Sequence, residues 1–367
     1  MATEEEQLVI SIGPQHPSTH GVLHVIVTLD GEVIVDAQPD IGYLHRGMEK
    51  MAENRTYLQF SPLTDRLDYV SSMSNNWGYA RAVERLMDIA VPERAEFLRV
   101  VFAELQRIAS HTLSIGTGGL DTGAWTPFLY LFNERETILN LFEAACGARL
   151  TYNYIRVGGL ARDVPAGWVE ECRAFVEQFP AKCDECERLL FDNYIFQERT
   201  KDVGVLSGED ALAGGATGPV LRGSGVDYDL RKADPYSTYE LFDFDVPLGS
   251  AGDTFDRFYV RLEEMRQSSR IILQALDAMP KGPVFAQRVP RVMTPAPGEV
   301  YEHIESTRGE LGFYVVSRGG PRPYRLKIKS PAFSNLSLLP LISRGATLSD
   351  LVVILGSLDP VFGEVDR

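Results

Sequence analysis

Residues 92–118 read PERAEFLRVVFAELQRIASHTLSIGTG and decide the fold class of this chain. Proline suits the first turn of a helix, and Pro92 opens the segment. Side chains suited to a helix interface then recur at steps of three and four residues, at Leu98, Val101, Leu105, Ile108, Thr112 and Ile115. That spacing places them on one face of an α-helix. We expect a long helix that ends at Gly116 and Gly118.

Further helical patterns lie on both sides of this segment. One begins at Pro127, one covers residues 165–191, and one runs from Phe255 to Leu276, where Pro280 stops it. Long helices that carry an apolar stripe pack together as a bundle. The sequence therefore predicts a mainly helical core.

Strand patterns occupy the two ends of the chain. In Val22–Leu29, apolar side chains alternate in the period of a half-buried strand, with Leu8–Ile12 before it and Glu32–Asp36 after it. Gly312–Val316 and Tyr324–Lys329 form a second strand pair. We predict an α+β fold in one integrated domain: an N-terminal antiparallel sheet over 1–40, a helical bundle over 41–280, and a C-terminal β/α segment over 281–367.

Composition excludes several classes of protein. The 44% of hydrophobic residues is enough for a large core, which excludes a disordered chain. The formal net charge of −15 argues against sequence-independent nucleic-acid binding, which needs a cationic surface. No segment approaches the roughly 20 apolar residues of a membrane span. We expect a soluble chain in a reducing compartment, a reading that leaves room for a membrane-embedded partner.

The four cysteines do not predict a metal site. Cys183 and Cys186 form a C-x-x-C pair, but Cys146 and Cys172 are isolated. Because a structural zinc or cluster site needs four ligands, packing is the better interpretation of the pair. The sequence also lacks H-E-x-x-H, a Walker loop and a G-x-G-x-x-G after a strand, so we expect no NAD or ATP site on this chain.

Three polar positions are candidates for chemistry. His20 lies in the loop Gly13–Gly21, which two prolines stiffen, and an imidazole exchanges protons near neutral pH. Tyr69 and Arg66 lie in a polar run and share a face if that run is helical. Asp121 lies at a turn between helices, where capping of the next helix is an equally good interpretation.

A set of motifs in a fixed order is more specific than any of these features alone. The motifs are GPQHPSTHG at 13–21, GYLHRG at 42–47, ENRTY at 53–57, RIASH at 107–111, NYIRVGG at 153–159, RGELG at 308–312 and DPVFGEVDR at 359–367. In their order, the chain resembles nearly end to end the 49-kDa family of respiratory complex I, the NADH:quinone oxidoreductase. That family is related to the large subunit of nickel–iron hydrogenases, which implies a hydrogenase-like fold.

The resemblance also shows what is missing. Hydrogenases carry an early and a late pair of cysteines that bind the metals. The positions that match them here are Asp68, Ser71, Val361 and Glu364. Soft thiolates are what such a metal site requires. We therefore expect that this chain binds no metal and no flavin.

In the family, the former metal cavity is a chamber for quinone reduction. The resemblance implies that His20 and Tyr69 hydrogen-bond the two sides of the quinone head group. Asp121 matches the carboxylate that pairs with this histidine, and Arg66 matches an arginine near the terminal iron–sulfur cluster of a neighbouring subunit. Thr151 stands where many relatives have a histidine beside that cluster. Because threonine does not titrate near neutral pH, we expect a weakly pH-dependent cluster potential.

By resemblance, the chain is the quinone-site subunit of a proton-translocating NADH:quinone oxidoreductase. Partner subunits B, C, I and H, of which C resembles the 30-kDa subunit, B carries the iron–sulfur cluster and H lies in the membrane, would then bind this chain on the cytoplasmic side of a bacterial membrane. NAD and the iron–sulfur clusters would belong to partners, and quinone would be the substrate. Alternatives are a ferredoxin- or other donor-linked quinone oxidoreductase, a nickel–iron hydrogenase large subunit, and a scaffold without a quinone site.

Overall fold

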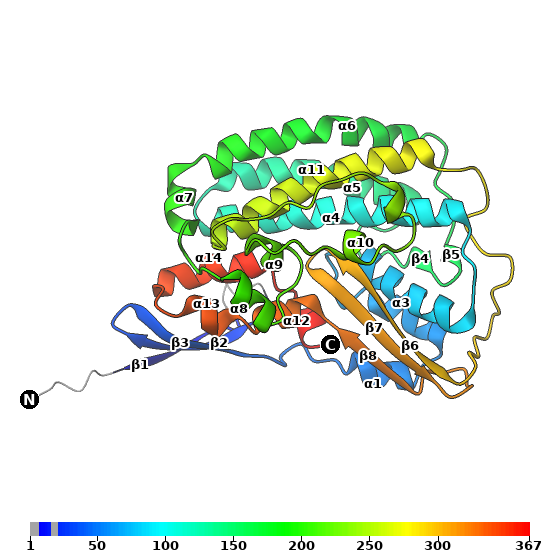
Figure 1. The fold of residues 1–367 in the computed structure, drawn as a ribbon, viewed down its shortest axis with the longest axis horizontal. Coiled ribbons are helices and arrows are strands. Elements are labelled where there is room, and N and C mark those ends of the chain that lie inside the picture. The colour runs from blue at the N-terminus through cyan, green and yellow to red at the C-terminus, as the bar shows by residue number, and fades with distance from the viewer. Residues whose placement is uncertain (1–6, 16–20) are drawn as a thin grey trace, which may run out of the picture.

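The computed structural model describes residues 7–15 and 21–367 of the chain. Figure 1 shows long helices stacked above two separate antiparallel sheets. The N-terminal sheet lies at one lower end, and the sheet of the C-terminal third lies at the other. The predicted α+β class is confirmed.

The core of the bundle consists of α4 (Glu93–Asp121), α5 (Trp125–Cys146), α6 (Trp168–Cys186) and α11 (Thr254–Ala278). Aromatic rings join these helices: the ring centroid of Phe102 lies 5.9 Å from that of Phe142 and 4.9 Å from that of Trp168. Burial of such large side chains contributes most of the stability of a core.

The predicted end of α4 at Gly116 and Gly118 is wrong, because the helix continues to Asp121. Gly118 serves close packing and does not stop the helix. A Cβ atom at this position would lie 2.5 Å from the ring of Phe258 on α11. Two helices can approach this closely only where one of them lacks a side chain.

Shorter helices connect these elements. The helix predicted over 165–191 is α6 followed by a π-helical turn, η2 (Glu187–Phe191). The remaining helices are α1 (Met48–Glu53), α2 (Tyr57–Thr64), α3 (Ser72–Met87), α7 (Tyr194–Thr200), α8 (Gly208–Ala213), α9 (Pro219–Gly223), α10 (Leu230–Ala233), the 3-10 turn η3 (Tyr239–Leu241), α12 (Pro331–Leu336), α13 (Leu339–Ser343), α14 (Leu348–Leu358) and α15 (Phe362–Val365).

The N-terminal sheet has the order β1 (Leu8–Ile12), β2 (His24–Asp30) and β3 (Val33–Asp40). Its inner face follows the predicted alternation, since Val25 and Val27 are fully buried while Ile26 between them is exposed. These strands share a hydrophobic core with α12–α15. The two ends of the chain therefore pack against each other.

The second sheet has the order β6 (Gly298–Ser306), β7 (Gly309–Ser317) and β8 (Arg325–Lys329). Both predicted strands exist, but β6 was missed because glutamates alternate with its apolar residues. A further two-stranded pair is formed by β4 (Ile155–Arg156) and β5 (Gly159–Leu160). The tight turn between β6 and β7 carries Arg308, whose buried side chain reaches the candidate site.

Candidate functional site

The turn of residues 65–71 between α2 and α3 carries two of the predicted site residues. It is not helical, so the predicted helical face for Arg66 and Tyr69 is wrong. Asp68 shapes the turn, because its Oδ1 accepts hydrogen bonds from the backbone N–H of Val70 (2.9 Å) and of Ser71 (3.1 Å). The Tyr69 side chain is 38% exposed at the surface of this turn. Burial, followed by the charge of Asp68, raises the pKa of Tyr69.

A buried arginine holds the carboxylate beneath this turn. Arg308 Nη1 donates to Asp68 Oδ2 at 2.8 Å, and its Nη2 donates to Asp359 Oδ1 at 3.1 Å. Asp68 is fully buried, which raises its pKa, while the charge of Arg308 opposes that shift. The arginine therefore joins three segments that are far apart in the sequence.

The four positions that match hydrogenase cysteines are all buried. Ser71 Oγ lies 3.1 Å from Ser306 Oγ, and Glu364 Oε1 accepts the N–H of Ala332 at 2.9 Å. Burial, followed by the charge of Asp68, raises the pKa of Glu364 to about 8. The C-terminal segment lies against the turn: a Cβ at Gly363 would be only 2.6 Å from the carbonyl oxygen of Leu67.

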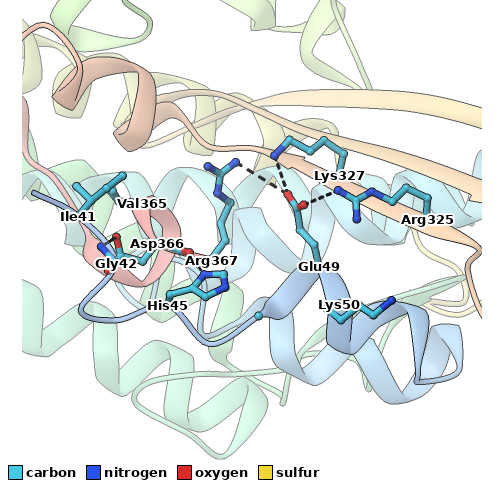
Figure 2. A pocket seen from close by; sticks show the side chains of 11 residues that line it. Ile41, Gly42, His45, Glu49, Lys50, Arg325, Lys327, Val365, Asp366 and Arg367 are labelled. Carbon is cyan, nitrogen blue, oxygen red and sulfur yellow. Dashed lines mark hydrogen bonds and ion pairs between the residues drawn. The ribbon is translucent and has the colours of Figure 1, made fainter.

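A pocket of about 420 Å³ on the other side of the C-terminal segment helps to fix that segment (Figure 2). Asp366 accepts the backbone N–H of Gly42 at 3.0 Å and of Leu44 at 2.6 Å. Glu49 accepts hydrogen bonds from Arg325 and Lys327 at the opposite wall. The predicted site residues that the structure describes do not line this pocket.

Asp121 is the last residue of α4 and is partly buried. Burial raises its pKa to about 6. Its Oδ2 has no hydrogen-bond partner among residues 7–15 and 21–367, and α5 begins after Ala124 without a side-chain cap. The capping interpretation is therefore wrong. His20, the predicted partner of Asp121, lies outside the described residues.

Arg66 is exposed on the 65–71 turn, and its Nη1 donates to the carbonyl of Pro62 at 2.7 Å. Arg46 lies nearby: its Nη2 donates to the carbonyl oxygens of Arg66 (2.7 Å) and of Gly363 (2.8 Å). Burial, followed by the charge of Arg66, lowers the pKa of Arg46. The exposed edge of the turn is consequently positively charged.

Thr151 lies in a segment that contacts the start of the same turn. The backbone N–H of Asn153 donates to Asp65 Oδ2 at 2.9 Å. Asp65 is fully buried, and this burial raises its pKa to about 7. Thr151 has a φ of 53°, which is uncommon for a β-branched residue. Sequence reasoning missed Asp65, whose only signal was its place beside Arg66 in a polar run.

No group of three or more His, Cys, Asp or Glu side chains in the described part of the chain is arranged to hold a metal ion. Cys183 and Cys186 are buried in the bundle, and burial raises the pKa of Cys186 to about 12. A thiol with so high a pKa is a poor ligand and a poor nucleophile. Among residues 7–15 and 21–367, no helix is long and apolar enough to cross a membrane.

Comparison with known proteins gives one consistent result. The family model described as "Respiratory-chain NADH dehydrogenase, 49 Kd subunit" matches residues 121–296 and 287–367. A protein of Desulforamulus reducens that is named as a subunit of NADH-quinone oxidoreductase is 52% identical over 100% of both chains. Proteins of the same name from Methylacidiphilum infernorum and Geobacter sulfurreducens are 53% and 50% identical, over 100% and 99% of this chain and 93% and 99% of theirs.

These matches confirm the resemblance stated from the motifs. They cover the turn at 65–71, the Thr151 segment and the C-terminal segment whose contacts are described above. The chain belongs to the family of the 49-kDa subunit of the respiratory-chain NADH dehydrogenase.

Proposed function

We propose that this chain is the quinone-site subunit of a proton-translocating NADH:quinone oxidoreductase. The observation that carries the proposal is the phenol of Tyr69, which is partly exposed on a rigid turn above buried carboxylates. A charge at Asp68 is already compensated by Arg308, so this place suits proton chemistry better than a metal. The names of the relatives support the same activity.

Quinone reduction needs two electrons and two protons. The electrons would come from an iron–sulfur cluster held by a neighbouring subunit, near Arg66. Tyr69 would donate a hydrogen bond to one quinone carbonyl and stabilise the negative charge that develops there. His20 would do the same for the other carbonyl, and Asp121 would orient the imidazole, which would then act as a general acid with a carboxylate partner.

The same proposal includes the partners. As one component of a larger enzyme, the chain would bind the iron–sulfur subunit, the partner that resembles the 30-kDa subunit, the other peripheral partner and the membrane-embedded partner, on the cytoplasmic side of a bacterial membrane. The electron donor would be NADH, with ferredoxin or another carrier as the alternative. The positively charged edge formed by Arg46 and Arg66 is a suitable surface for the subunit that carries the electron-rich cluster.

A photoreactive quinone analogue tests the position of the site. In the assembled complex we expect the label on the peptide that contains Tyr69, with protection by an excess of native quinone. Tyr194, which is 73% exposed, is the matched control for non-specific labelling and should not be protected. Absence of protectable label at Tyr69 would support the scaffold alternative instead.

The potential of the partner's terminal cluster is expected to depend only weakly on pH, because Thr151 has no titratable group. Asp65 is the nearby carboxyl whose pKa is about 7, so Asp65→Asn should remove the slope that is left. Thr151→His should create a steep dependence around its pKa of about 6.5, and histidine tolerates the positive φ of 53° better than threonine. Redox titration of the cluster signal at several pH values measures all three; a steep slope in the unmodified enzyme contradicts the expectation.

A further inference from the structure

The buried cluster below Tyr69 contains more carboxyl groups than its arginine can pair with. Arg308 forms ion pairs with Asp68 (2.8 Å) and with Asp359 (3.1 Å). Glu364 is fully buried and interacts electrostatically with both Asp68 and Arg308. It has no ion pair with a described residue at 4.0 Å or less, and its Oε2 has no hydrogen-bond partner within the described part of the chain.

An unpaired buried carboxylate is costly, and such a group avoids the cost by binding a proton. The one hydrogen bond that Glu364 accepts, from the backbone N–H of Ala332 at 2.9 Å, uses Oε1. This bond is compatible with a neutral acid that carries its proton on Oε2. Asp68 is different because Arg308 and two backbone N–H groups stabilise its charged form.

The groups that face Glu364 come from several elements. Asp68 belongs to the 65–71 turn, Arg308 to the turn between β6 and β7, and Ser330 to the start of α12. The backbone of Ala332 and the hydroxyl of Ser330 oppose the rise in the pKa of Glu364, as does Arg308. Burial and the charge of Asp68 outweigh these groups, and the pKa is raised to about 8.

We infer that Glu364 is a neutral carboxylic acid in the resting enzyme and that it supplies, through Asp68, the proton that Tyr69 gives to the quinone. This inference rests on the function proposed above. The quinone takes two electrons from the partner's cluster and one proton from the Tyr69 hydroxyl, which leaves a phenolate. The O–H bond of Glu364 breaks, Asp68 accepts that proton and passes one on, and a new O–H bond restores the phenol. Glu364 is left as a carboxylate until solvent reprotonates it.

Geometry supports this route, because neighbouring segments hold its members close together. Tyr69 follows Asp68 directly, and the charge of Asp68 acts on both Tyr69 and Glu364. The close contact of Gly363 with the carbonyl of Leu67 fixes the short helix α15 against the turn. Glu364 does not touch the quinone in this arrangement; it stores and replaces a proton.

Infrared spectroscopy of the assembled complex tests the resting state. Glu364→Gln has nearly the same shape and keeps an acceptor for Ala332, so it should remove one protonated-carboxyl C=O band at neutral pH. Glu302→Gln is the matched control, because Glu302 is buried but pairs with Arg81 at 3.0 Å and also with Arg85. The control should leave the band unchanged. A band that persists in Glu364→Gln overturns the inference.

Kinetics test the transfer. With Glu364→Gln, kcat for quinone should fall about 10-fold with unchanged KM, and the alkaline decline of the wild-type rate above pH about 8 should disappear. Glu364→Asp, which keeps an acid, should restore part of both the rate and the band. Unchanged kcat and an unchanged pH profile overturn the inference. Normal activity of Tyr69→Phe with the Glu364 band still present would instead overturn the proposed function and leave the protonation of Glu364 standing.

Discussion

Replacing Tyr69 by phenylalanine is expected to lower the quinone reductase activity of the assembled enzyme by about 100-fold. The change removes only the hydroxyl, so the ring can keep its place on the 65–71 turn, which Asp68 holds through the N–H groups of Val70 and Ser71. Without the hydroxyl, one quinone carbonyl loses its hydrogen-bond donor while negative charge develops on it. The measurement is the NADH:quinone turnover of the purified complex.

Two controls separate this effect from a defect in assembly. Tyr194→Phe changes a tyrosine that is 73% exposed and should leave turnover unchanged. Electron transfer from NADH to an artificial acceptor, which does not use the quinone site, should remain normal in Tyr69→Phe. Near-normal quinone turnover in Tyr69→Phe would exclude this residue from the reaction.

Replacing Arg308 by methionine is expected to destabilise the chain by about 3–5 kcal/mol. Methionine fills much of the space, but it leaves the charges of buried Asp68 and of partly buried Asp359 without the ion pairs of 2.8 and 3.1 Å that now compensate them. The fall in free energy of unfolding can be followed by urea titration of the purified chain, with the fluorescence of buried Trp77 and Trp168 as the signal.

Arg325→Met is the matched control for this substitution. Arg325 also bridges two carboxylates, Glu49 and Glu53, both at 3.1 Å, but its side chain is half exposed. Solvent already stabilises charges at such a position, so the loss should stay below about 1 kcal/mol. Equal effects of the two substitutions would show that burial does not govern the strength of the Arg308 cluster.

Local patterns were sufficient for much of the fold. The alternation around Val25 and Val27 and the helical spacing from Leu98 to Ile115 depend only on neighbours in the sequence, and both predictions are confirmed. The end of α4 was not predictable in this way, because Gly118 continues the helix and gives room to a ring on α11. The same holds for the turn of residues 65–71, whose shape depends on the burial of Asp68.

For the site, the order of motifs along the chain identified the family and named Tyr69, Asp121, Arg66, Thr151 and His20. The sequence alone also determined that Asp68, Ser71, Val361 and Glu364 replace thiolates. Only the tertiary structure decided which carboxyl groups are charged. Asp68 and Arg308 are 240 residues apart in the sequence, and the proton affinity of a carboxyl group depends on burial and on the charges that folding brings beside it. Such contacts join distant segments, and no local pattern of residue types encodes them.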